Sequence, residues 1–234
     1  NLFYGGKLHS APICNKKFPL FFGNNIFFMN MDGDSTYCER QDLTEYGNKT
    51  GPYNEREIEV AVALIKKLRE NFSERIAVIT PYRNQNKKLQ QRLYSERLKN
   101  IVVNTIDAFQ GDEADVVIYC TTRSKIPKDY FSEAARINVA FSRARNLLII
   151  IGAMKYFYKY KAEHLMQKVA ESLKRSGRIV NVADFFAADF QMNFSAPLQT
   201  EKIFNNLTET LLYASEAEKY LPVPNNVTSL SYCR

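Results

Sequence analysis

Arginine, glutamine and carboxylate side chains gather in three short segments, each beside an apolar run that predicts a β-strand. The segments are AVITPYRNQ at 77–85, VNTIDAFQGDEADVVIY at 103–119 and RINVAFSRARNLLIIIG at 136–152. In open α/β sheets, ligands collect at the carboxyl ends of the strands. A planar guanidinium at such a place stabilises charge that spreads over the oxygens of a phosphoryl group. We therefore expect the three segments to form one edge of a sheet, where a ligand binds.

Strands and helices that alternate along the chain must position these segments. Apolar runs predict strands at 26–31, 76–80, 101–106, 115–121, 147–152 and 178–182, and periodic apolar positions predict helices at 55–68, 84–98, 132–145 and 157–175. The run at 115–121 has too little polar alternation for a sheet with one wet face. This order predicts an α/β domain with a mostly parallel sheet and helices on both faces. Residues 191–234 differ in character and predict an appendage or linker, with one helix at 200–220.

The composition restricts the classes of partner and compartment. Lys and Arg number 32 against 25 Asp and Glu, a net charge of +7 that favours a polyanion such as nucleic acid, although many basic proteins bind none. The 4 cysteines include no Cys-x-x-Cys pair, so no metal site is predicted. The sequence shows neither a signal peptide nor an apolar run of about 18 residues. We expect a soluble, intracellular protein without a membrane partner.

The three polar segments resemble motifs IV, V and VI of superfamily 1 helicases, in the form found in the Upf-like and senataxin-like branch (superfamily 1B). The motif V pattern V-x-T/S-V-D-x-F-Q-G-x-E-x-D is met by Val103, Thr105, Asp107, Phe109, Gln110, Gly111, Glu113 and Asp115, and only Ile106 departs from it. The motif VI pattern R-x-N-V-A-x-T/S-R-A-R/K is met by Arg136, Asn138, Val139, Ala140, Ser142, Arg143, Ala144 and Arg145. FYGGKL at 3–8 and the N-x-x-E run from Asn54 to Glu57 are weaker matches, and the resemblance covers about residues 1–182.

The resemblance implies an architecture in which this chain supplies only part of an ATP site. In that family, ATP lies between two RecA-like domains, and the first domain supplies the Walker lysine and the carboxylates that hold Mg²⁺. Residues 1–190 are then a RecA-like, P-loop NTPase-type domain 2, which works with domain 1 of the same parent chain and with ATP and Mg²⁺. The sequence has no G-x-x-x-x-G-K-[ST] element, so the fragment alone is expected to be inactive. The family's motif III is expected to precede residue 1.

The resemblance also implies roles at the nucleotide. Arg143 corresponds to the arginine finger, and Arg83 to a second ligand of the γ-phosphate. The other implied nucleotide contacts are Glu113 at the ribose, Tyr82 at the adenine or the cleft wall, and Gln110 and Gly111, which couple the nucleotide state to the grip on the strand.

A second set of residues is implied to contact a single strand of DNA or RNA. Thr105 corresponds to a hydroxyl that binds a phosphate, a contact that positions the strand without reading its sequence. Asn84 and Asp107 are expected to contact the same strand. Arg136 and Arg145 are expected to hold their helix by internal ion pairs.

Two further motifs do not predict a ligand site, and one alternative function stays open. The run from Gly5 to Lys7 is followed by Leu8 instead of the Ser or Thr that a phosphate-binding loop requires, and Asp32-Gly33-Asp34 reads as a turn. The leading hypothesis is the second motor domain of an ATP-dependent helicase or translocase that moves 5′ to 3′. The alternative is a non-motor nucleic-acid-binding module on the same scaffold. Two kinds of parent protein fit the sequence, a nuclease-helicase fusion and an RNA-surveillance factor.

Overall fold

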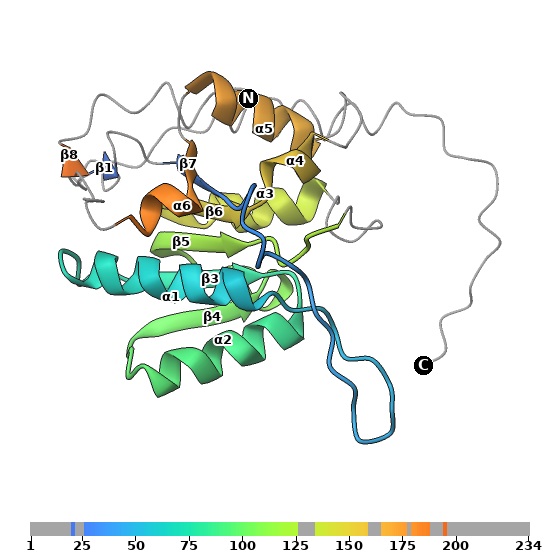
Figure 1. Cartoon of the computed structure of the whole chain (residues 1–234). Helices are drawn as coiled ribbons and strands as arrows, with labels where there is room; N and C mark the ends of the chain where they lie inside the picture. The colour runs from blue at the N-terminus through green and yellow to red at the C-terminus, as the bar shows by residue number, and fades with distance from the viewer. Residues whose placement is uncertain are drawn as a thin grey trace.

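A six-stranded sheet forms the centre of the molecule (Figure 1). The computed structural model describes residues 20–21, 26–125, 134–158, 165–176, 179–187 and 194–195. All neighbouring strands of the sheet are parallel, in the order β4-β3-β5-β6-β2-β7. The strands are β2 (Ile26–Asn30), β3 (Ile76–Thr80), β4 (Ile101–Thr105), β5 (Ala114–Cys120), β6 (Ala144–Gly152) and β7 (Ile179–Asn181). The α/β class with a parallel sheet is confirmed.

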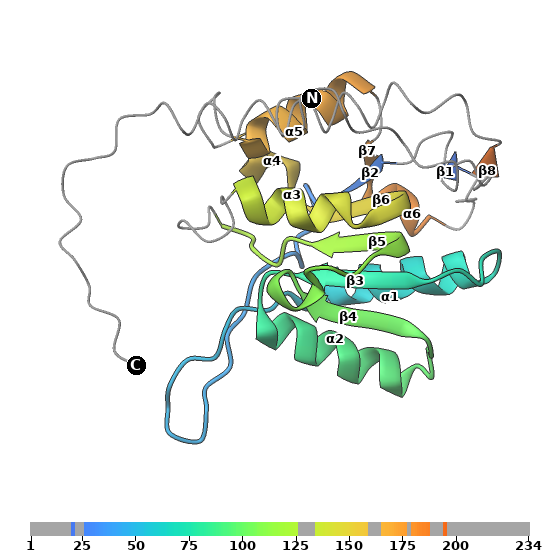
Figure 2. The same ribbon diagram turned by 180° about the vertical axis from the view of Figure 1, so that it is seen from behind.

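Helices cover both faces of this sheet. They are α1 (Glu55–Arg69), α2 (Arg83–Ser95), α3 (Ala134–Ser142), α4 (Met154–Phe157), α5 (Leu165–Ser176) and α6 (Val182–Phe185), with a short 3₁₀ turn, η2 (Asp107–Phe109). Buried side chains of α1, α2 and α6 pack on one face, whereas those of α3, α4, α5 and η2 pack on the other. Opposite views show this division, with α1 in front of the sheet in Figure 1 and α3 in front of it in Figure 2.

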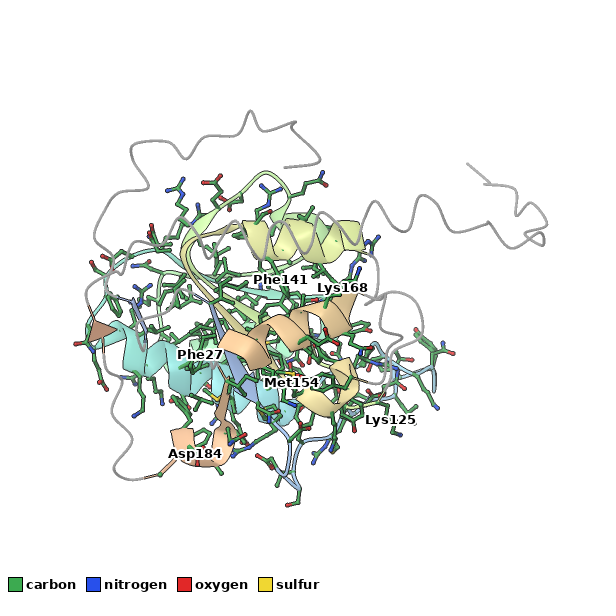
Figure 3. The ribbon with its side chains drawn as sticks, turned by 90° about the horizontal axis from the view of Figure 1, so that it is seen from above. Phe27, Lys125, Phe141, Met154, Lys168 and Asp184 are labelled. Atoms are coloured by element: carbon green, nitrogen blue, oxygen red, sulfur yellow. The ribbon has the colours of Figure 1, made fainter. Side chains whose placement is uncertain are left out.

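The central strands are apolar on both faces because each face lies under a helical layer. Along β5, Val116 and Ile118 belong to the core on the α1 side, whereas Val117 and Tyr119 belong to the core on the α3 side. The Tyr119 ring meets Phe141 of α3 edge-on, with 5.3 Å between ring centroids. Figure 3 views the molecule from the side of α3, α4 and α5 and labels Phe141. The lack of polar alternation in this strand therefore predicted its environment correctly.

Two predicted helices and one predicted strand need correction. The helix predicted to include Arg143 ends at Ser142, because the Arg143 carbonyl accepts a hydrogen bond from the Ala114 amide (3.1 Å) and strand β6 begins at Ala144. The predicted helix at 157–175 is replaced by α4 and α5, with 159–164 outside the described residues. The strand predicted at 178–182 ends at Asn181, and α6 begins at Val182. The predicted helix at 200–220 lies outside the described residues.

The segment predicted as an appendage contains one described element. Strand β8 (Phe194–Ser195) pairs antiparallel with β1 (Leu20–Phe21) as a separate two-stranded sheet. The division of the chain at residue 190 stays a prediction.

Candidate functional site

The sheet has two edges at which site residues lie, and the topology decides which residues share an edge. Because the strands are parallel, the residues before each strand lie at the amino edge and those after each strand lie at the carboxyl edge. Strand β5 contains 7 residues, so at about 3.3 Å per residue its two ends lie roughly 20 Å apart. A residue just before β5 or β6 is therefore far from one just after β3 or β4.

The amino edge brings together Glu113 and Arg143. Glu113 immediately precedes β5, Arg143 immediately precedes β6, and Ala114 and Ala144 are paired across the two strands. Arg145, the second residue of β6, donates from Nε to the Glu113 carboxylate at 2.7 Å. The pairing of two neighbouring strands thus places the Arg145–Glu113 ion pair at the same edge as Arg143.

Arg143 is partly buried, and its guanidinium is not used in holding the described fold together. Its Nε atom is shielded from solvent and has no hydrogen-bond acceptor among the described residues. A shielded donor without an acceptor is uncommon in folded proteins, because it loses its hydration without gaining a partner. Arg143 is therefore suited to receive an anionic ligand at this edge.

The loop before β5 is held by Arg75 and Asp112, which have no predicted role, and by Asp115 of motif V. Arg75 donates through both guanidinium nitrogens to the Asp112 carboxylate, one contact measuring 2.8 Å, and holds the pKa of Asp112 below its ordinary value. Asp115 accepts from the Arg75 amide at 3.2 Å and from the Asn146 amide group at 3.1 Å. Both aspartates lie in the motif V segment, so the signal was present, but their partner before β3 is remote in the sequence.

Gln110 and Gly111 connect the two edges. They follow η2 and precede the amino-edge loop, and both are exposed. Gly111 has a φ of 86°, a left-handed conformation that glycine adopts without strain, and nothing lies within 4 Å of a Cβ built there. Gly111 therefore allows the chain to turn at this point, and the space beside its Cα atom is open.

Tyr82, Arg83, Asn84, Thr105 and Asp107 lie at the carboxyl edge, so the expectation of a single edge was wrong. The first three follow β3, and the last two lie at the end of β4 and in η2. The strand directions separate these residues from Arg143, by a distance much longer than an arginine side chain. Arg83 and Arg143 are consequently not brought together on one phosphate group, and Tyr82 is not brought to Glu113.

The carboxyl-edge residues differ in how they are already engaged. Arg83 is exposed at the start of α2. Asn84 donates to the Thr50 hydroxyl (3.1 Å) and to the Gly51 carbonyl (2.9 Å). Thr105 accepts from the Ala108 amide at 3.4 Å.

Two further groups at this edge make charged or aromatic contacts. The Asp107 carboxylate lies 3.8 Å from the Arg136 guanidinium, an internal pair of the kind expected for that arginine. The Arg123 guanidinium lies over the Tyr82 ring, with its Cζ atom 5.9 Å from the ring centroid.

A buried carboxyl group, Glu57, lies beneath the carboxyl edge. It accepts hydrogen bonds from the Tyr37 hydroxyl (2.9 Å), the Thr121 hydroxyl (2.8 Å) and the Thr122 amide (2.8 Å). Burial raises the pKa of Glu57 to about 8, although these hydrogen bonds oppose the shift. Its Thr122 partner has a φ of 69°, an unusual conformation for a β-branched residue.

Glu57 was noticed in the sequence only as the last residue of an N-x-x-E match. The Asn54 side chain caps α1 by accepting from the Glu57 amide at 3.3 Å. In a reciprocal capping box, the glutamate would bond back to the Asn54 amide, but that amide donates to Gln85 at 2.7 Å instead. The Glu57 carboxyl group is thereby released to hold the end of β5.

No helix among the described residues is long and apolar enough to cross a membrane. In the same part of the chain, no three His, Cys, Asp or Glu side chains come together as metal ligands.

A family model and several proteins match this chain. The family model described as AAA domain matches residues 1–155. DNA polymerase alpha-associated DNA helicase A of Saccharomyces cerevisiae is 32% identical over 145 residues, which cover 60% of this chain and 21% of that protein. An uncharacterized ATP-dependent helicase of Caenorhabditis elegans is 31% identical over 176 residues, which cover 74% of this chain and 10% of that protein.

Helicase sen1 of Schizosaccharomyces pombe is 31% identical over 155 residues, which cover 58% of this chain and 9% of that protein. The chain thus spans between 9% and 21% of the length of these three relatives. The extent of the family match and the likeness to these helicases agree with the motifs of the three polar segments. The chain belongs to the AAA-domain family of Upf-like and senataxin-like superfamily 1 helicases.

Proposed function

We propose that this chain is the second RecA-like motor domain of an ATP-dependent superfamily 1 helicase or translocase. The ATP site is shared with a first RecA-like domain of the same parent protein. This chain contributes Arg143 and Glu113, which lie at the amino edge of its sheet. The observation that carries the proposal is Arg143 at the amino edge, a partly buried residue whose shielded Nε atom has no hydrogen-bond acceptor among the described residues. The similarity to an ATP-dependent helicase of Caenorhabditis elegans supports the same function.

Arg143 is the arginine finger in this proposal. During phosphoryl transfer, charge spreads over the oxygens of the transferred group, and a guanidinium donating to them lowers the barrier. Arginine fingers contribute about 10³ to 10⁵ in rate. Arg143 lies in a turn between α3 and β6, so closure of the two domains would bring it to the γ-phosphate as part of a rigid edge.

Glu113 binds the ribose in this proposal. A carboxylate accepts hydrogen bonds from the sugar hydroxyls, and Arg145 orients it through the 2.7 Å ion pair. Gln110 and Gly111 lie on the segment that joins the amino edge to Thr105, so their movement would couple nucleotide binding to the strand.

ATP supplies the phosphoryl group and Mg²⁺ offsets its charge when both are bound. Arg143 and Glu113 have the chemistry to hold the γ-phosphate and the ribose of that nucleotide. We place the Mg²⁺ ligands and the phosphate-binding loop on the first RecA-like domain.

A single strand of nucleic acid lies at the carboxyl edge in this proposal. Thr105 offers a hydroxyl to a backbone phosphate, and the carbonyl oxygen of the Asn84 side chain faces the same strand. Asp107 provides an acceptor for donors on bases or sugars, since its charge would repel a phosphate. Arg83 contacts this nucleic-acid strand and not the γ-phosphate, because it is exposed at the carboxyl edge. Tyr82, the residue before it, contacts the same nucleic-acid strand.

In the full-length protein, hydrolysis would drive movement along the strand from 5′ to 3′. The test is nucleic-acid-stimulated ATPase activity of this chain alone and of the full-length protein. We expect turnover only in the full-length protein, faster with single strands than without. If the full-length protein binds strands but shows no turnover, the domain belongs to a non-motor binding module.

A further inference from the structure

The hairpin of residues 40–53 projects from the carboxyl edge beside α2 and forms one wall of a groove. The hairpin is the blue loop that extends away from the sheet in Figure 1, and backbone bridges join Arg40 to Tyr53 and Leu43 to Lys49. The groove has a volume of about 700 Å³ and lies between the tip of this hairpin and the first half of α2. Nothing in the proposed function assigns a role to it.

The hairpin is held against α2 by specific contacts. The Lys88 ammonium group lies 2.9 Å from the Asp42 carboxylate and 4.0 Å from the centroid of the Tyr53 ring. The Tyr53 hydroxyl also donates to Asp42 at 2.9 Å. Together with the two hydrogen bonds from Asn84 to the base of the hairpin, these contacts fix the groove in one shape.

A tight turn presents an aromatic ring at the tip of the hairpin. The Thr44 amide donates to the Asn48 carbonyl at 2.7 Å, and the Gly47 amide donates back to the Thr44 carbonyl at 2.9 Å. Gly47 has a φ of 75°, which closes the turn. Tyr46, within this turn, is 87% exposed and lines the groove.

The opposite wall carries positive charge. Lys87 is exposed on α2 and lines the groove, and Arg83 stands one turn before it. The first turn of α2 contains no acidic residue, although the helix dipole favours one there. The charge of Asp42 is offset by Lys88, whose contact lowers the pKa of Asp42.

We propose that this groove binds a single strand of nucleic acid, with a base stacked on Tyr46 and a phosphate held by Lys87. Glu45 lies next to Tyr46 and would repel a phosphate, so the phosphates run along α2 and the bases face the hairpin. Stacking on an aromatic ring accepts any base, as a motor that moves along a strand requires. Asn84 lines the groove and also lies among the strand contacts of the carboxyl edge, so the groove continues that path.

The position of the groove favours a strand over a protein partner. The first motor domain has to face the amino edge, where Arg143 lies, and the groove is at the opposite edge. Besides Tyr46, the groove offers only Leu43 as a large exposed apolar side chain among the described residues. A protein interface would bury a larger apolar centre. This inference rests on the proposed function, which supplies the strand.

The test is strand binding by the full-length protein and its variants, measured by fluorescence anisotropy with labelled oligo(dT) and oligo(U). We expect Tyr46→Ala to weaken binding by roughly five- to 150-fold, the range for loss of one stacked base, and Tyr46→Phe to keep wild-type affinity. Tyr94 is a matched control because it is also 87% exposed and lies near the other end of α2. Tyr94→Ala should bind like the wild type.

Two results would overturn the groove as a strand site. One is unchanged affinity in Tyr46→Ala, and the other is an equal loss in Tyr94→Ala. If Tyr46→Ala is silent while Arg83→Ala weakens binding, the groove fails and the proposed function stands. If the wild-type protein binds neither oligonucleotide, the proposed function fails as well.

Discussion

Glu57 shows at the scale of one residue how the carboxyl edge is fixed. Its side chain is fully buried, and three donors from two parts of the chain point to it. A left-handed conformation costs about 1–2 kcal/mol for a residue other than glycine, and the hydrogen bond that the Thr122 amide donates to Glu57 offsets part of this strain. The residue is therefore a structural support under the strand contacts.

The raised pKa of Glu57 predicts a dependence of stability on pH. Its pKa is about 8 in the folded protein against an ordinary value of 4.5, so the folded state retains a proton that the unfolded state releases. Stability from this group is complete below about pH 4.5 and is lost as pH rises to about 8. Thermal unfolding of the wild type and Glu57→Gln across this range should show the wild type losing stability relative to the variant.

The glutamine variant is a close mimic, because its amide can donate to the two rotatable hydroxyls and accept from the Thr122 amide. Glu57→Ala, in contrast, leaves that amide without an acceptor and should lower the free energy of unfolding by about 2–4 kcal/mol. Parallel pH profiles for the wild type and Glu57→Gln would contradict a buried protonated carboxyl group.

At the scale of elements, the close approach of two strand ends is a second support. The end of β6 lies against Thr121, which follows β5 and donates to Glu57. A Cβ at Gly152 would lie 2.7 Å from Cγ2 and 2.8 Å from Oγ1 of Thr121. Only glycine fits at this end of β6 without moving Thr121.

Gly152→Ala should therefore lower the free energy of unfolding by about 1–3 kcal/mol, as overpacking does in well-packed sites. Gly51→Ala is the matched control, because the nearest atom to its Cβ is 3.8 Å away, and should change stability by less than about 0.5 kcal/mol. Chemical denaturation of both variants measures the difference. Equal stability of the two would show that Thr121 moves aside freely.

The elements themselves could be predicted well from the sequence where apolar runs were long. Strands β2 to β6 and the start of α1 at Glu55 were located within a few residues, because periodic burial leaves a local signal. The end of α3 was wrong, since the pairing of Arg143 with the remote Ala114 decides it. Helix propensity carries no information about such a partner.

At the scale of the whole molecule, the parallel sheet separates two groups of residues that the motifs presented together. The motifs gave Arg143 and Glu113 roles on one nucleotide, and the pairing of β5 with β6 brings both residues to the amino edge. Arg83 follows the strand predicted at 76–80, whereas Arg143 precedes the strand predicted at 147–152, so in a parallel sheet this order already indicates opposite edges. Grouping the three segments by their polar character alone missed it. The contacts that shape the groove join the hairpin of residues 40–53 to α2. They could not be predicted from the sequence, because the two segments are remote from each other along the chain.

This separation predicts that the two edges have separable functions. Arg83→Ala should weaken binding of single strands and reduce the slope of log affinity against log salt by about one, while stability is unchanged. Lys99→Ala removes an exposed positive charge just before β4, at the amino edge, and is the control. Anisotropy titrations over a series of salt concentrations give both slopes. Equal slopes for Arg83→Ala and the wild type would contradict a contact between Arg83 and a phosphate of the nucleic-acid strand.

The central claim is that Arg143 completes an ATP site shared with another domain. Steady-state ATPase activity of full-length Arg143→Ala, together with nucleotide binding, tests it most directly. We predict a fall in kcat of about 10³- to 10⁵-fold with ATP affinity largely retained, because the guanidinium acts on the charge of the transition state. Arg143→Lys keeps the charge but not the planar fork, and should recover little of the lost rate. Turnover near the wild-type rate in Arg143→Ala would contradict the account.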